Sequence, residues 1–355
     1  MSRNMRVGVV GAGTMGAGIA QGAALGGYQV SLYDQNPEAL DRACKQISDS
    51  NRRAVDKGRL TAAEAEAATA RVQPAAILTD LAPCDLVVEA VIEDSTIKAR
   101  LFTGLSTVLS QHAVIATNTS SLRVDDLAAS VLHSERFLGL HYFFPAAINP
   151  LLEIVRGSAT SDTAMDVAAD FARATGKQPI RCRDSFGFAV NRFFVPYLNE
   201  ATRLAEEGFA MGEIEAAIMA AFATAAGPFR IMDMSKPAIA LHACRTLTQL
   251  GPFYEPSALL TRVGQSGESW NVTPAAGDAE RATIIVERIQ GAILTAVLEA
   301  LETEVATPDD IDLGARIGLQ WGWQPCAGAR TMGRAKLERL VAPHFQGRTI
   351  PVNLP

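Results

Sequence analysis

The stretch HYFFPAAINPLLE, residues 141–153, contains two residues that could carry out acid–base chemistry. His141 ends one apolar run, and Glu153 lies inside the next. Two prolines between them exclude a shared helix face, but two strands joined by a turn would bring them together. An imidazole titrates near neutral pH and can take a hydroxyl proton, while a carboxylate on its other nitrogen would fix the tautomer. The pair is either a catalytic base with its orienting acid or two ordinary residues beside a loop.

A glycine-rich turn near the start of the chain indicates a dinucleotide site. The motif GAGTMG follows the β-branched run RVGVV and opens a helical pattern of small residues. In that context Gly11 permits a tight turn, Gly13 lets the backbone approach a pyrophosphate, and Gly16 lets helix and strand pack closely. The free N–H groups of the helix start would hold the phosphate charge. The predicted cofactor loop comprises Gly11, Ala12, Gly13, Thr14, Met15 and Gly16.

Asp34 ends the next predicted strand, QVSLY. A carboxylate at this place accepts hydrogen bonds from a ribose 2′-hydroxyl and repels a 2′-phosphate, so the sequence predicts NAD rather than NADP. The alternative is a structural glycine turn followed by a surface aspartate.

The succession of strand, glycine turn, helix and strand predicts an α/β fold with a doubly wound parallel Rossmann sheet. Further strands are expected at 85–91, 113–117 and 136–141, and their continuous apolar character predicts that both sheet faces are covered. Residues 38–71 have helical spacing interrupted by KGRLT, which predicts an inserted helical hairpin with Thr61 as an N-cap. His141 would then lie at the carboxyl edge of the sheet, where such folds bind ligands.

From residue 186 onward the pattern is helical. The run 186–208 has apolar residues at three-to-four spacing, and Pro196 is expected to kink that helix. We therefore predict three domains: 1–185, the NAD-binding domain; 186–270, a helical substrate domain; and 271–355, a diverged second copy of that all-α domain.

A weak internal repeat underlies the prediction of a second copy. Residues separated by 97 positions match in type, as in Ile214 and Ile311 (311 − 214 = 97) or Pro228 and Pro325. The same offset places Arg288 at the position of Asn191. A site built on Asn191 would therefore exist once.

Bulk properties exclude several classes of protein. The formal net charge is −6 and the pI is about 5.5, which argues against a nucleic-acid partner. No apolar run approaches the roughly 20 residues of a membrane span, and the first strand begins too early for a signal peptide ahead of it. The five cysteines are scattered without C-x-x-C spacing, so we expect reduced thiols, no metal site and a cytoplasmic protein.

Six motifs together resemble a known family. In chain order they are VGVVGAGTMGAGIAQ, DLVVEAVIED, TNTSSL, GLHYFFP, LLEIV and GFAVNRFFVPYLNEA. In order and spacing they resemble the L-3-hydroxyacyl-CoA dehydrogenases over about residues 5–242. The remainder looks like a second helical copy of the kind found in multifunctional fatty-acid oxidation proteins. The resemblance implies oxidation of an L-3-hydroxyacyl-CoA to the 3-oxoacyl-CoA with reduction of NAD.

The resemblance also implies residue roles. His141 would be the base and Glu153 its orienting partner, while Ser120 and Asn191 would hydrogen-bond the substrate oxygens. Asn191 could instead be a buried helix residue bonded to backbone, and Ser120 with Ser121 could cap the following helix.

Two further pairs of positions match family contacts. Glu89 and Lys98 match positions on the ribose side of the cofactor, although they could form a structural ion pair. Ser50 and Lys57, on the predicted hairpin, match positions that touch coenzyme A. Lys57 could equally be an ordinary charge at a helix C-terminus.

The sequence departs from the family pattern where the acyl chain is expected to lie. Phe144 replaces the asparagine of the usual H-F-F-N-P, and Lys236-Pro237 replaces a Gly-Leu. The segment QSGESWNV, 265–272, stands where a GRGFY motif is usual. Acyl length, branching and terminal group are therefore open.

Two other functions remain compatible with these residues. One is a dehydrogenase of a free hydroxy acid, such as the gulonate or carnitine dehydrogenases of the same superfamily. The other is a non-catalytic dinucleotide-binding relative. A second helical copy could cover the surface through which single-copy relatives dimerise, so both a monomer and a homodimer are compatible with the sequence.

Overall fold

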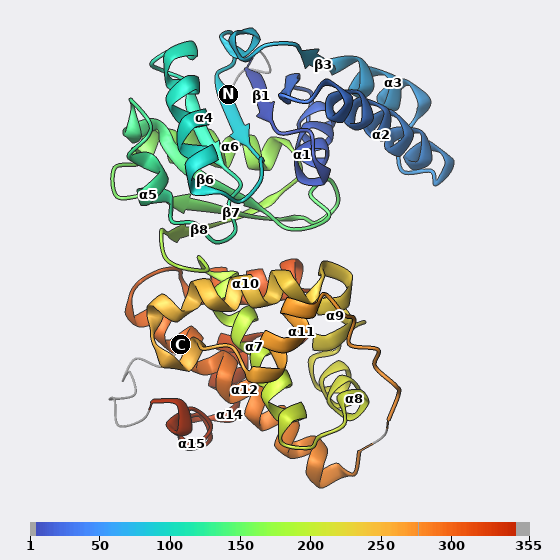
Figure 1. Cartoon of the computed structure of the whole chain (residues 1–355), viewed down its shortest axis with the longest axis vertical. Helices are drawn as coiled ribbons and strands as arrows, with labels where there is room; N and C mark the ends of the chain where they lie inside the picture. Colours follow the sequence, from blue (N-terminus) through green and yellow to red (C-terminus); the bar gives the residue numbers. More distant parts are fainter. Residues whose placement is uncertain (1–4, 276, 346–355) are drawn as a thin grey trace. The chain divides into compact units, whose positions relative to one another are not determined.

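The computed structural model describes residues 5–275 and 277–345. The chain divides into two compact units, Met1–Asp184 and Ser185–Pro355, and each is considered by itself (Figure 1). The first unit is a sheet with helices on both faces, and the second is helical. The predicted α/β class followed by an all-α region is confirmed.

The sheet has eight strands in the order β3-β2-β1-β4-β5-β6-β7-β8. The strands are β1 Arg6–Val10, β2 Gln29–Tyr33, β3 Val72–Ala75, β4 Leu86–Glu89, β5 Val114–Thr117, β6 Phe137–Tyr142, β7 Leu151–Arg156 and β8 Gln178–Arg183. All five strand runs expected from the sequence up to β6 are present. Strands β3 and β8 were not predicted, because β3 carries Pro74 and β8 alternates buried with exposed residues.

The doubly wound prediction implied a wholly parallel sheet, but the observed sheet contains one antiparallel pair of strands. Strand β7 pairs antiparallel with β6 and parallel with β8. The connection between β6 and β7 spans residues 143–150, which is too short for a crossover helix. The chain therefore turns back directly. This reversal brings the two ends of the stretch HYFFPAAINPLLE, residues 141–153, side by side.

Helices cover both sheet faces. They are α1 Thr14–Leu25, α2 Pro37–Asp56, α3 Ala62–Arg71, α4 Ser95–Val108, α5 Val124–Ala128 and α6 Asp162–Ala174. Helices α1 and α6 pack on one face, where alternate residues of six strands join one apolar core. On the other face Phe102 of α4 lies against Phe137 of β6, with ring centroids 4.9 Å apart. Burial on both faces explains why the strands are apolar throughout.

The predicted helical hairpin is formed by α2 and α3. Thr61 caps α3 as predicted: its hydroxyl accepts from the backbone N–H of Glu64, and the Glu64 carboxylate accepts from the N–H of Thr61. This reciprocal capping satisfies two helix-start donors.

The second unit is built around two long helices, α7 and α12 (Figure 1). Its helices are α7 Val190–Glu206, α8 Met211–Phe222, α9 Pro228–Ser235, α10 Pro237–Leu247, α11 Ala258–Ser266, α12 Ala279–Glu302, α13 Pro308–Leu313, α14 Pro325–Met332 and α15 Arg334–Phe345. Pro196 lies inside α7. Residues 190–247 are called the first helical segment below, and residues 279–345 the second helical segment.

The 97-residue offset recurs in the coordinates of these segments. Helices α8 and α13 begin at 211 and 308, α9 and α14 at 228 and 325, and α10 and α15 at 237 and 334 (308 − 211 = 325 − 228 = 334 − 237 = 97). Lys236 and Gly333, also 97 apart, precede α10 and α15 with nearly equal φ of 78° and 79°.

A buried carboxylate holds the start of a helix in each segment. Glu215 accepts from the backbone N–H groups of Phe229 (2.7 Å) and Arg230 (3.3 Å) at the start of α9. Asp312 accepts from those of Cys326 (2.7 Å) and Ala327 (2.9 Å) at the start of α14. Every one of these residues is displaced by 97 positions from its counterpart.

Two general properties follow from the described residues. In the ranges 5–275 and 277–345, no helix is both long and apolar enough to cross a membrane. All five cysteines are free thiols, and four of them are buried.

Candidate active site

The glycine-rich turn has the geometry that a dinucleotide needs. Gly11 has φ +103°, and a Cβ there would lie 2.5 Å from the carbonyl oxygen of Ala90. A Cβ on Gly16 would lie 1.8 Å from the carbonyl oxygen of Gly11, so only glycine fits. A Cβ on Gly13, in contrast, would meet no atom within 4 Å, which leaves that backbone open to a phosphate. No side chain caps the start of α1, so its N–H groups remain available to an anion.

Asp34 is fixed beside this turn. One carboxylate oxygen accepts from the backbone N–H of Ala12 (2.7 Å) and the other from that of Asn36 (2.8 Å). Each oxygen retains a second lone pair for a ribose hydroxyl. The turn and the aspartate therefore fit the adenosine half of NAD.

His141 and Glu153 face each other directly across β6 and β7, as the sequence predicts. The His141 Nδ1 to Glu153 Oε2 distance is 2.5 Å, and the two residues are 6% and 0% exposed. A carboxylate at this contact accepts from Nδ1, so the pair favours the tautomer that carries its hydrogen on Nδ1. The ring of Phe143 lies 4.6 Å from the imidazole, centroid to centroid, and restricts it further.

The pair lies at the carboxyl edge of the sheet. The strand register aligns Val10, Glu89, Thr117 and Gly139 across β1, β4, β5 and β6, and His141 lies two residues beyond that level. The Asn118 side chain accepts from the backbone N–H of Tyr142 (2.9 Å), which joins the loop after β5 to the end of β6. The histidine and the Ser120 loop therefore share the edge at which the glycine turn also lies.

Glu93 organises the loop that carries Ser120, and the sequence analysis missed it. One oxygen of its carboxylate accepts from the hydroxyls of Thr119 (2.5 Å) and Ser121 (2.9 Å) and from the backbone N–H of Ser120 (3.1 Å). Its other oxygen lies 3.1 Å from the Lys98 ammonium. The alternative in which Ser120 and Ser121 cap the next helix is wrong, because α5 begins at Val124 and has no side-chain cap.

The charge on Glu93 is stabilised by these neighbours. Burial raises the pKa of its carboxyl, but Lys98 and the Thr119 and Ser121 hydroxyls outweigh burial, and the net effect is a lowered pKa. Glu93 is therefore ionised at neutral pH and keeps the loop in one conformation. A clue was present in the sequence: Glu93 follows the end of β4 by four residues in a turn rich in acids.

Glu89 and Lys98 form a buried ion pair. The Lys98 ammonium lies 2.6 Å from the Glu89 carboxylate, and their side chains are 1% and 0% exposed. Glu89 also accepts from the Thr117 hydroxyl (2.6 Å) and the Val91 N–H (2.7 Å). These contacts match the structural alternative, and a contact of either residue with the cofactor stays a prediction.

The residues predicted to touch coenzyme A lie on α2 and its end. Ser50 accepts a hydrogen bond from Gln21 of α1 (3.0 Å) and is partly buried. Lys57 forms the C-cap of α2 and is exposed. Lys57 is thus available to a phosphate, whereas Ser50 already helps to join the hairpin to α1.

Asn191 belongs to the second unit, so its geometry is considered there. It lies in the first turn of α7 and is partly exposed. The next residue, Arg192, is buried, and its guanidinium donates to the Ser185 hydroxyl (2.8 Å).

The loop between His141 and Glu153 presents apolar side chains. Phe144, at the position of the usual family asparagine, is 65% exposed, and Ile148 is 69% exposed. Lys177 anchors this loop by donating to the carbonyl oxygens of Ala146 (2.6 Å) and Asn149 (2.7 Å). Burial lowers the pKa of Lys177 to about 8.

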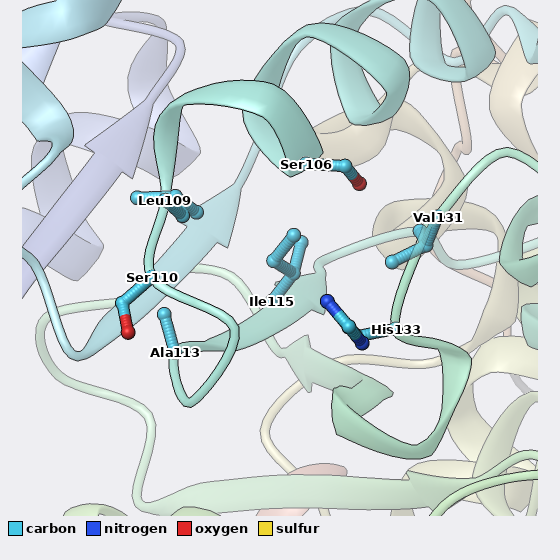
Figure 2. Close-up of a pocket in the computed structure, with 7 residues that line it drawn as sticks. All are labelled: Ser106, Leu109, Ser110, Ala113, Ile115, Val131 and His133. Carbon is cyan, nitrogen blue, oxygen red and sulfur yellow. The ribbon is translucent and has the colours of Figure 1, made fainter.

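One pocket of the first unit does not belong to this site. Figure 2 shows its side chains around the start of β5, the end of the strand opposite Thr117. The lining residues are Ser106, Leu109, Ser110, Ala113, Ile115, Val131 and His133. Within 5–275 and 277–345, no cluster of three or more histidines, cysteines or acids could hold a metal ion.

Comparisons with known proteins agree with this geometry. Residues 6–185 match the family model described as 3-hydroxyacyl-CoA dehydrogenase, NAD binding domain, and residues 187–274 match the model of its C-terminal domain. A 3-hydroxybutyryl-CoA dehydrogenase of Mycobacterium tuberculosis is 37% identical over 268 residues, 74% of this chain and 94% of that protein. The human mitochondrial hydroxyacyl-coenzyme A dehydrogenase is 36% identical over 266 residues, 72% and 84% of the two chains.

A solved structure extends the similarity to the second helical segment. The 3-hydroxybutyryl-CoA dehydrogenase of Escherichia coli K12 has a TM-score of 0.89 and 26% identity, with 98% of this chain and 97% of that chain covered. The glycine turn, the histidine–glutamate pair and the two family models agree. The chain therefore belongs to the 3-hydroxyacyl-CoA dehydrogenase family of NAD-dependent oxidoreductases.

Proposed function

We propose that His141 is the base with which this dehydrogenase oxidises an L-3-hydroxyacyl-CoA to the 3-oxoacyl-CoA. The observation that carries the proposal is the 2.5 Å contact between His141 Nδ1 and Glu153 at the carboxyl edge of the sheet. Bound NAD⁺ supplies the hydride acceptor at this edge. The residues of the chain bind, orient and deprotonate the substrate.

His141 takes the proton of the 3-hydroxyl group on Nε2. As that proton arrives the imidazole becomes an imidazolium, and the Glu153 carboxylate stabilises its positive charge. Because Glu153 is fully buried, little water competes with it for Nδ1. The pair therefore favours the proton transfer and also keeps the ring in one orientation.

Ser120 and Asn191 donate hydrogen bonds to the substrate oxygens. Donors held near a developing carbonyl are most effective when they are oriented before the reaction. Glu93 supplies that orientation for Ser120, since its carboxylate accepts from the backbone N–H of Ser120 and from both neighbouring hydroxyls. Lys57 and Ser50 are proposed to contact coenzyme A, and the exposed Lys57 ammonium suits a phosphate.

The helical region is proposed to contain two copies of one domain, residues 186–270 and 271–355. Three equal helix offsets and the matched Glu215 and Asp312 caps support the duplication. Since α12 packs along α7, a monomer is proposed over a homodimer. Sedimentation that shows a stable dimer would refute this part.

A cytoplasmic location is also proposed. Five free thiols are typical of a reducing compartment.

A substrate screen tests the proposed function. NADH formation is followed with L-3-hydroxyacyl-CoAs of graded chain length, their D-isomers and the matching free hydroxy acids. The proposal expects turnover of the L-thioesters, with much lower kcat/KM for the free acids. Preference for a free acid would instead support a hydroxy acid dehydrogenase, and NAD binding without any turnover would support a non-catalytic protein.

A further inference from the structure

A buried polar chain in the second unit joins the two helical segments. The Arg192 guanidinium lies 3.2 Å (Nε) from the Tyr254 hydroxyl, and that hydroxyl donates to the Glu299 carboxylate at 2.7 Å. The closest Arg192 nitrogen to that carboxylate is 3.9 Å away. Arg192, Tyr254 and Glu299 are 4%, 2% and 7% exposed. Arg192 belongs to α7, and Glu299 belongs to α12 of the second helical segment.

At its other end, this series of polar contacts reaches the residues that lead into α7. Arg192 donates from its guanidinium to the Ser185 hydroxyl at 2.8 Å and from its backbone N–H to the Gly187 carbonyl at 3.0 Å. Gly187 has φ +78°, and a Cβ there would lie 2.8 Å from Leu247 and 3.0 Å from the Arg192 nitrogen. Residues 185–192 are therefore folded tightly around Arg192, and Asn191 is its immediate neighbour.

The positions that correspond to Arg192 and Glu299 at the 97-residue offset carry no charge. The positions 97 residues from Arg192 and Glu299 are Ile289 and Thr202 (192 + 97 = 289; 299 − 97 = 202), and both are fully buried. Removing charges from water is costly, and an apolar pair of similar volume is often as stable. The charged contacts occur at Arg192, next to Asn191, where the Arg192 guanidinium also donates to Ser185.

We propose that Glu299 is a positioning residue for Asn191: through Tyr254 it fixes the Arg192 guanidinium, which ties the first turn of α7 to Ser185. The second helical segment thereby supports the substrate site with a carboxylate of its own. This inference rests on the proposed function, in which Asn191 donates to a substrate oxygen.

A double-mutant cycle tests the inference. Glu299→Gln and Tyr254→Phe are each made in the wild-type and Asn191→Ala backgrounds, with Glu302→Gln, an exposed acid of the same helix, as the control. We expect Glu299→Gln to lower kcat/KM about tenfold with unchanged NAD⁺ affinity. In the Asn191→Ala background the same change should cost less than about twofold, because coupled residues are not additive. Equal losses in both backgrounds, or none in the wild type, would overturn the proposal.

A second readout does not depend on turnover. Amide hydrogen exchange at residues 185–192 should be faster in Glu299→Gln and Tyr254→Phe than in the wild type and in Glu302→Gln. Unchanged exchange at these residues would overturn the positioning role, whatever the enzyme does with acyl-CoAs. If the wild type turned over no thioester but exchange still rose, the proposed function would fail while the structural chain from Glu299 to Ser185 would stand.

Discussion

The two helical segments have equal helix offsets but differ where the first carries its predicted site residue. Each segment has a carboxylate that holds a helix start, Glu215 in the first and Asp312 in the second. Asn191, however, corresponds to Arg288, whose guanidinium is bonded to Glu200 and Glu207 at 2.5–3.0 Å. At this offset the carboxylates at the helix starts match, whereas the residue proposed to contact substrate does not.

The residues near Asn191 also differ from those near Arg288. In the first helical segment Val190 is buried and Ile239 is 58% exposed. Their counterparts are Glu287 and Lys336 (190 + 97 = 287; 239 + 97 = 336), which form an ion pair at 3.0 Å, and Arg339 joins it at 2.9 Å. The counterpart of Arg339 is His242 (339 − 97 = 242), so two of the three positions that form these ion pairs are apolar in the first segment. The second segment therefore matches the first in helix spacing but not at the position of Asn191.

Within the comparison of the two helical segments, the largest expected effect separates Asn191 from Arg288. Asn191→Ala should lower kcat about 100-fold, because a donor oriented toward developing charge is lost. Arg288→Ala should leave kcat within about twofold but lower the free energy of unfolding by about 3 kcal/mol, because buried Glu200 loses its main partner. Steady-state kinetics and urea unfolding measure both quantities. A 100-fold loss of kcat in Arg288→Ala would contradict the comparison.

The two helix caps should prove equivalent in stability. Glu215→Ala and Asp312→Ala should each cost about 2 kcal/mol, since each leaves buried N–H groups without an acceptor. Chemical denaturation measures the loss, and Glu302→Ala, on an exposed surface, is the control. A cost near zero for Asp312→Ala alone would show that the second cap is dispensable.

A smaller effect of opposite sign is expected at the residues before α10 and α15. Lys236 and Gly333 both have positive φ, and a side chain there is strained. Lys236→Gly should therefore stabilise the protein by about 1 kcal/mol, whereas Gly333→Lys should destabilise it by a similar amount. The melting temperatures of both variants test this pair. Destabilisation by Lys236→Gly would mean that the lysine side chain makes a compensating contact.

The smallest effect concerns the acid dependence of the second helical segment. Hydrogen bonds from Arg339 and then Lys336 lower the pKa of Glu287 to about 2, although burial opposes them. A carboxyl with a lowered folded-state pKa adds stability above its unfolded pKa of roughly 4.3, and that stability is lost as pH falls toward 2. Arg339→Met should flatten unfolding free energy against pH in this window. An unchanged slope would show that the surface pair contributes nothing, as is common for exposed pairs.

The sequence predicted most of the first unit because its signals are local. The glycine turn and the apolar strands follow from short-range pattern, and opposite placement of His141 and Glu153 follows from two strands joined by a short turn. The turn between these strands implies that β7 runs antiparallel to β6, whereas strand β8 was not predicted. Strand β3 was not predicted, because it contains a proline and proline is unusual in strands.

Glu93 could not be predicted by pattern alone. Its function depends on a loop about 27 residues away, and it lies in an irregular turn where sequence periodicity carries no information. Glu299 is a similar case, since it reaches Arg192 through Tyr254 across 107 residues (299 − 192 = 107). Long-range polar networks need coordinates, whereas the helix offsets were already visible as matched residue types.

The most direct test of the account compares the kcat of the wild type, His141→Gln and Glu153→Gln. All three are assayed with one L-3-hydroxyacyl-CoA that the wild type turns over. His141→Gln should lower kcat about 1,000-fold or more with little change in NAD⁺ affinity, and Glu153→Gln should lower it less, since the imidazole remains. Turnover of His141→Gln within tenfold of the wild type would contradict the assignment of His141 as the base.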